Sequence, residues 1–204
     1  MAALSPSDTA RAFFQALERG DWVGAAALAD PEWVALNARR QIGGLAVMVR
    51  MEELERARAP GEDRGSGALA QIPEDSTAVA ELAQRYGHHR WKRYSGGEVT
   101  LAELAALTPT QLLALQFEGL AAFRAQSSRW PSWQILGEVT EGDSLAFVVC
   151  RAAGLFTSLS AADAHILHMR RTPEGWRCRL DHNGIQFGLH GILVLWSGPE
   201  PTDT

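Results

Sequence analysis

The segment that most constrains the fold is a pair of strand-like runs, Ala164–Arg171 and Trp176–His182, joined by Thr172–Gly175 (TPEG). Proline at the second position and glycine at the fourth position of this loop are typical of a type I turn. The loop predicts an antiparallel hairpin in which Arg171 pairs with Trp176. Because side chains alternate along a strand, one face of the hairpin is then apolar and the other is basic.

The apolar face of this hairpin has histidines at its open end. Its predicted cross-strand pairs are Met169–Cys178, Leu167–Leu180 and His165–His182. A histidine acts as an acid or base near neutral pH when a carboxylate orients it, and Asp163 lies two residues before His165. His165, His182 and Asp163 are therefore the candidate catalytic residues. The alternative is that one or both histidines bond to the backbone at a strand end. No helical histidine pair or cysteine pair supports a metal site, so we expect none.

A second hairpin precedes the first along the chain. Trp133–Thr140 and Ser144–Ala152 flank a tight turn at Glu141–Asp143. A two-residue turn at Glu141-Gly142 would align on one face Trp133, Ile135, Val148 and Cys150. The run Leu145–Cys150 is apolar on both faces, which predicts a central strand covered on both sides.

Helix signals dominate the first 125 residues. Ser5 and Asp21 are expected to cap two short helices, the second of which is stopped by Asp30-Pro31. Glu32–Asn37 favours an extended segment. Residues 45–58 are expected to form a helix with one buried end. Pro60–Gly67 combines proline, glycine and charges and predicts a mobile surface loop.

Three further helices are expected after this loop. The first ends at Gly87, and the other two begin at capping boxes, Thr100 with Glu103 and Thr108 with Gln111. The last of them is long, and its apolar positions include Leu112, Leu113, Phe117 and Leu120. Helices first and hairpins last predict an α+β fold with an antiparallel sheet.

Composition limits the class of protein and its partners. The 204 residues are 46% hydrophobic, which suits one large globular domain. A net charge of −5 argues against nucleic acid as a partner. No apolar run reaches the ~18 residues that span a bilayer, so we expect no membrane partner. Without a secretory signal, and with Cys150 and Cys178 in apolar strands, we expect a cytoplasmic protein with reduced thiols.

Two parts of the chain resemble the nuclear transport factor 2-like superfamily. Asp8–Asp30 (DTARAFFQALERGDWVGAAALAD) is similar to its paired N-terminal helices, and Glu138–Asp181 (GDSLAFVV and ILHMRRTPEGWRCRLD) to its C-terminal strands. The resemblance implies a cone, in which a curved sheet wraps around a long helix and leaves a cavity at the open end. Because the middle is much longer than in such domains, we expect one domain over 1–204 with a helical insertion at 39–97 and a disordered tail at 199–204.

The resemblance implies a small-molecule pocket without deciding its use. We expect Tyr86, His88, Met169 and Trp176 to line the pocket of a protein that binds a small apolar ligand, forms a homodimer and needs no cofactor. Tyr86 and His88 are included among the pocket residues because the basic, aromatic segment Tyr86–Tyr94 could act as a lid. That segment could instead grip a phosphate or a base, or be a solvated loop anchored by its aromatic side chains.

Two alternatives to simple binding stay open. One is an acid–base enzyme, such as an isomerase, dehydratase or cyclase, acting on an apolar substrate. The other is a non-catalytic dimerisation or interaction domain. A continuous cavity reaching the two histidines would favour the enzyme, whereas a core filled by Phe117, Met169 and Trp176 would favour the interaction domain.

Overall fold

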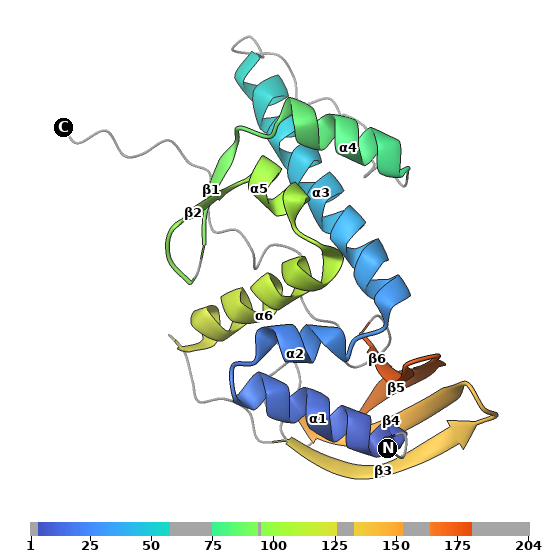
Figure 1. Ribbon diagram of the computed structural model, residues 1–204. Helices are drawn as coiled ribbons and strands as arrows, with labels where there is room; N and C mark the ends of the chain where they lie inside the picture. The colour runs from blue at the N-terminus through green and yellow to red at the C-terminus, as the bar shows by residue number, and fades with distance from the viewer. Residues whose placement is uncertain (1–3, 58–74, 94, 126–132, 153–163, 181–204) are drawn as a thin grey trace.

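The computed structural model describes residues 4–57, 75–93, 95–125, 133–152 and 164–180. It is a mixed α+β fold, as predicted, with helices and a four-stranded antiparallel sheet (Figure 1). In chain order the elements are α1 (Pro6–Glu18), α2 (Trp22–Ala27), α3 (Pro31–Ala57), α4 (Ser76–Arg85), β1 (Arg90–Lys92), β2 (Glu98–Thr100), α5 (Leu101–Ala106), α6 (Pro109–Ala125), β3 (Trp133–Glu141), β4 (Leu145–Ala152), β5 (His165–Thr172) and β6 (Gly175–Arg179). None of these helices has both the length and the apolar character needed to cross a membrane.

The hairpin of β5 and β6 has the predicted register. Arg171 pairs with Trp176 and Met169 pairs with Cys178, so Leu167 and Met169 face the same side. Gly175 adopts a φ of +117°, which the turn requires of its last residue and which glycine adopts without strain. The predicted His165–His182 pair cannot be placed, because His182 lies outside the described residues.

The turn between β3 and β4 consists of residues 142–144 and is longer than a two-residue turn at Glu141-Gly142. Glu141 pairs with Leu145, and Gly142 in the turn has a φ of +61°. A bulge between Ile135 and Gly137 adds one residue to β3 and restores the alternation of its side chains. The predicted alignment of inner-face residues therefore holds, since Ile135 pairs with Cys150 and both face the core.

The described helices cover mainly the inner face of the sheet. On the inner face, Ala146 and Val148 of β4 are buried, whereas Leu145 on the outer face is 40% exposed. In the described residues no helix covers the outer face of β4, so the predicted cover on that face stays a prediction. Helix α1 packs against β3, β4 and β6 from the same side (Figure 1).

The N-terminal helices follow their predicted caps. The Ser5 side chain accepts a hydrogen bond from the backbone N–H of Asp8, and Asp21 accepts one from Gly24 in α2. The predicted capping boxes of α5 and α6 also form, with Thr100–Glu103 and Thr108–Gln111 bonded reciprocally. Local sequence therefore fixes where these four helices begin.

Helix α3 differs from prediction. Glu32–Asn37 is helical rather than extended, and the helix runs through Gly43-Gly44 without a break. Asp30 accepts a hydrogen bond from the backbone N–H of Glu32 and Pro31 occupies the first turn, so the pair that stops α2 also starts α3. Each glycine costs about 1 kcal/mol in a helix interior, and burial of Ile42, Leu45, Ala46 and Val49 offsets that cost.

The apolar side chains form two clusters. The sheet core lies between the inner sheet face and α1, α2 and α6, and the helical core lies among α3, α4, α5 and the β1–β2 hairpin. Helix α6 joins them, because Leu112 belongs to the helical core and Leu113 to the sheet core. The predicted insertion boundary at residue 39 falls inside α3, and the predicted loop Pro60–Gly67 and tail 199–204 lie outside the described residues.

The segment between α2 and α3 lies along the free side of β6. Ala29 pairs in parallel with Cys178, whose N–H donates to the carbonyl of Leu28 at 2.8 Å. The carbonyl of Cys178 in turn accepts from the N–H of Asp30 at 2.8 Å. The helical and sheet parts of the fold are thus hydrogen-bonded at this edge.

Candidate functional site

Of the three candidate catalytic residues, the structure describes His165 alone. It begins β5, pairs with Cys150 and is 4% exposed on the inner face of the sheet. Its Nε2 atom is buried and has no hydrogen-bond partner in the described part of the chain. Asp163 and His182 lie outside the described residues, so the predicted catalytic cluster stays a prediction.

The thiols nearest to this histidine in the sheet are poor nucleophiles. Burial raises the pKa of Cys150 to about 11 and raises that of Cys178 further. Both cysteines are buried and unpaired, which agrees with the expectation of reduced core thiols. Within the described ranges no three histidine, cysteine or acidic side chains come together as a metal site.

The sheet core is packed where the predicted pocket would open. Met169 and Phe117 are buried in it, and Trp176 packs against it. The ring of Phe117 meets that of Phe13 edge to face, with centroids 5.9 Å apart. Two of the four predicted pocket residues, Met169 and Trp176, therefore belong to the sheet core or pack against it.

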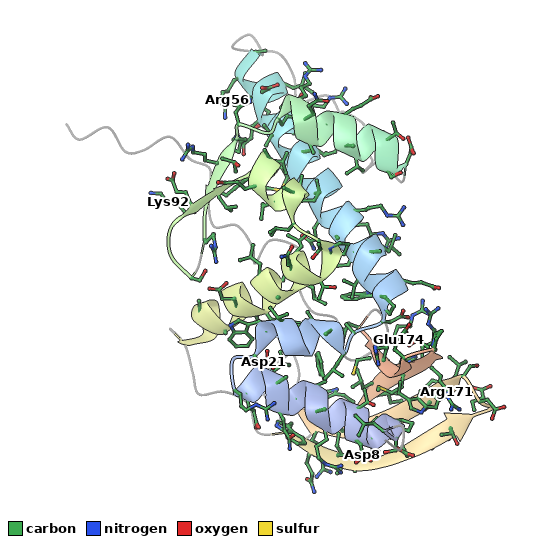
Figure 2. The ribbon with its side chains drawn as sticks, in the orientation of Figure 1. Asp8, Asp21, Arg56, Lys92, Arg171 and Glu174 are labelled. Atoms are coloured by element: carbon green, nitrogen blue, oxygen red, sulfur yellow. The ribbon has the colours of Figure 1, made fainter. Side chains whose placement is uncertain are left out.

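The other two predicted pocket residues lie in the helical part. Tyr86, just after α4, is buried in the helical core with the Arg85 guanidinium 5.4 Å from its ring centroid, while His88 is exposed. Lys92 on the neighbouring β1 lies in the opposite half of the molecule from Glu174 in the β5–β6 turn (Figure 2). The segment that starts at Tyr86 is thus not placed over the sheet.

This basic segment has structural roles in the described residues. Trp91 is buried and contacts the ring of His89 in a tilted arrangement, with centroids 4.6 Å apart. Arg93 forms a salt bridge with Glu118 of α6 at 3.0 Å. These contacts fit the anchored-loop interpretation better than a phosphate or base site. Burial, the largest effect, lowers the pKa of His89, which favours its neutral form at pH 7.

A groove of about 500 Å³ opens between α3, α4, α5 and the start of α6. Its buried floor is apolar and consists of Ile42, Val79, Ala83, Leu104 and Leu112. Polar side chains stand at its exposed mouth, namely Arg39, Ser76 and Gln84. The geometry suits a largely apolar molecule that also makes a few polar contacts.

Sequence reasoning did not find this groove. Its walls are rich in alanine at helical spacing, with the pairs Ala35–Ala38, Ala80–Ala83 and Ala102–Ala105. Residues three apart share one helix face, so small side chains on facing helices leave space between them. That spacing is the signal in the sequence, although an alanine stripe alone more often marks close helix packing.

The chain matches no protein-family model, no curated protein and no solved structure. Its function therefore has to be argued from its own residues.

Proposed function

We propose that this chain binds a small apolar molecule in the groove between α3, α4, α5 and α6. The observation that carries the proposal is the groove itself, whose volume of about 500 Å³ lies in the range of small-molecule sites, roughly 300–1,000 Å³. Its buried aliphatic floor supplies the hydrophobic driving force, and its polar mouth supplies orientation.

The chemistry of the groove supports binding without catalysis. Among the described residues that line it, Arg39 is the one ionisable side chain, and arginine does not exchange its proton near neutral pH. General acid–base catalysis needs a group that titrates, such as histidine or a carboxylate. The isomerase, dehydratase and cyclase alternatives depend instead on His165 or His182, of which His165 is buried and His182 lies outside the described residues.

The nuclear transport factor 2-like cone is part of the same proposal. The antiparallel order β3-β4-β5-β6, with α1 packed on the sheet and α2 packed against α1, supports it. In such a cone the pocket would lie over the inner sheet face, where Met169 and Phe117 are packed in this chain. We therefore assign the ligand to the helical groove that the long middle region builds.

Filling the groove tests the proposal. Ala105 lines the groove and is exposed, so Ala105→Phe adds bulk to its wall without opening the core. Ala27→Phe is the matched control, because Ala27 is an exposed alanine on α2 away from the groove. Decan-1-ol serves as an uncharged apolar probe, followed by amide NMR shifts.

We expect decan-1-ol to shift the amides of Val79, Ala83 and Leu104 in the unmodified chain. Binding should weaken about 10-fold in the Ala105 variant and stay unchanged in the Ala27 variant, because a phenyl ring removes contact area worth ~1–2 kcal/mol. Shifts confined to the inner sheet face, or equal affinity in all three proteins, would place the ligand elsewhere.

A second candidate function is dimerisation through the outer face of the sheet. An outer apolar patch there consists of Val139, Leu145, Phe147, Val149 and Ile166, of which Val139 is 62% exposed. Glu141, Leu145, Arg170 and Arg177 form one row across the four strands. A two-fold axis parallel to the strands would place Glu141 opposite the partner's Arg177, which supports a second copy of this chain as the occupant.

A further inference from the structure

We infer that the ligand of the groove is an apolar molecule that ends in a single negative charge, and that Arg39 pairs with that charge. This inference rests on the proposed function of the groove and adds the chemical class of the ligand. It rests on three features: the position of Arg39, the helix-capping hydrogen bonds of carboxylates near the groove, and the start of α6.

Arg39 lies at the exposed mouth of the groove, on the face of α3 that also carries Ala35 and Ile42. No acidic side chain lines the groove among the described residues, and Arg39 forms no ion pair with any of them. A guanidinium offers five donors in a planar fork that matches a carboxylate or a sulfonate. Arg39 is therefore available to an anion that enters from solvent.

Two of the acidic side chains next in sequence to the groove are engaged elsewhere, and a third, Glu81 beside Ala80, does not line the groove. Asp75, beside Ser76, accepts hydrogen bonds from the backbone N–H groups of Thr77 and Ala78 at the start of α4, both at 3.2 Å. Glu103 accepts a hydrogen bond from the N–H of Thr100 at 2.7 Å at the start of α5. Both carboxylates cap helices, so neither neutralises Arg39 by direct contact.

The start of α6 adds a weaker attraction of the same sign. Pro109, its first residue, lines the groove, so the positive end of this 17-residue helix lies at the groove wall. Ser76 and Gln84 at the mouth add a hydroxyl and an amide that can donate to an anionic oxygen. Arg39 and the start of α6 thus both lie beside an apolar floor.

This arrangement selects for one charge rather than several. A single guanidinium can balance one negative charge, and a second charge would go unpaired near an apolar floor. The net charge of −5 also disfavours polyanions. A medium-chain carboxylate has the required form, with an aliphatic tail for the floor formed by Ile42, Leu104 and Leu112 and one anionic end for Arg39.

Decanoate and decan-1-ol test the inference, because they share a chain length and differ in charge at pH 7.5. Titration calorimetry and amide NMR shifts are recorded for the full chain and two variants. Arg39→Gln removes the proposed partner. Arg40→Gln removes a neighbouring exposed arginine that does not line the groove, so it changes the net charge by the same amount.

We expect the unmodified chain to bind decanoate roughly 5- to 20-fold more tightly than decan-1-ol, as one partly exposed charge-assisted contact would give. Arg39→Gln should abolish this preference and leave decan-1-ol affinity unchanged, whereas Arg40→Gln should keep it. Equal affinity for both probes, or a preference that survives Arg39→Gln, would overturn the inference while leaving the groove as a binding site. Binding of neither probe would overturn the proposed function itself.

Discussion

Arg170 is the side chain through which the sheet holds the start of α3. Its guanidinium donates to Asp30, which is 1% exposed, at 3.0 Å, and also to Glu32. Without the arginine, the carboxylate of Asp30 would stay buried without its cation. We expect Arg170→Gln to lower the free energy of unfolding by about 2–4 kcal/mol, measured by urea denaturation.

The neighbouring residue provides the control for this change. Arg171 is exposed at the turn end of the sheet (Figure 2), so Arg171→Gln should stay within about 0.5 kcal/mol of the unmodified chain. If the two variants lose the same stability, the buried pair is not what holds α3 to β5.

The second ion pair of Arg170, with Glu32, makes stability depend on pH. A hydrogen bond from Arg170, and then its charge, hold the pKa of the Glu32 carboxyl below its ordinary value of 4.5. Because this carboxyl has a lower pKa in the folded state than in the unfolded state, its ionised form stabilises the fold at pH values above the unfolded-state pKa. This contribution to stability is lost as the pH falls through the folded-state pKa. Urea midpoints between roughly pH 3 and 6 should therefore fall less steeply toward acid in Arg170→Gln than in the unmodified chain. Parallel curves would contradict this link.

At the scale of elements, Gly87 permits the close approach of α4 and α5. A Cβ atom at this position would lie 3.0 Å from the carbonyl oxygen of Ala83 and 3.2 Å from the Cβ of Ala102. We expect Gly87→Ala to lower the free energy of unfolding by about 1–3 kcal/mol, because a backbone atom must move to admit the methyl group.

Gly137 in β3 offers the matched control. A Cβ added there meets nothing within 4 Å, so Gly137→Ala should be neutral or slightly stabilising. Thermal melts of both variants measure the difference. A Gly87 variant as stable as the Gly137 variant would mean that the two helices adjust freely.

The elements that could be predicted from sequence are those fixed by neighbouring residues. Ser5, Thr100 and Thr108 cap helices through side chains three residues apart, and the Thr172–Gly175 turn sets the register of the strands that flank it. Such contacts are local, so the pattern that predicts them is short.

Helix α3 and the groove depend on partners far away in the chain. Pro31 can end one helix or begin another, and the salt bridge from Asp30 to Arg170 on β5 stabilises the second outcome. The groove arises where alanines of separate helices face each other, and an alanine has no chemistry of its own to mark a site. Of the predicted pocket residues, Met169 and Tyr86 are buried and Trp176 is partly buried, and their role in binding stays a prediction.

At the scale of the whole molecule, we expect a homodimer formed through the outer apolar patch. Val139 and Ile166 are large apolar side chains exposed on a sheet face that the described helices leave uncovered. Burial of that patch in a partner would remove it from water. Sedimentation at tens of micromolar, where a micromolar dissociation constant gives mostly dimer, should show twice the monomer mass.

Val139→Lys should shift the chain to a monomer by placing a charge in the patch. Val23→Lys, at an exposed valine on α2, adds the same charge elsewhere and should leave the dimer intact. A monomer for the unmodified chain at this concentration would rule out the dimer, and a dimer lost equally in both variants would rule out the patch.

The short parallel bridge between Ala29 and Cys178 has a consequence for aggregation. Unpaired strand edges recruit other chains, and proteins avoid this by covering them. The segment before α3 satisfies both main-chain groups of Cys178, so β6 offers no open edge at that residue. Among the described strands, β3 forms the other edge of the sheet, where the bulge beside Ile135 and the charges of Glu138 and Glu141 oppose strand addition from a foreign peptide. In the described sheet, one edge is thus partly covered by a loop, and the other carries a bulge and charged side chains.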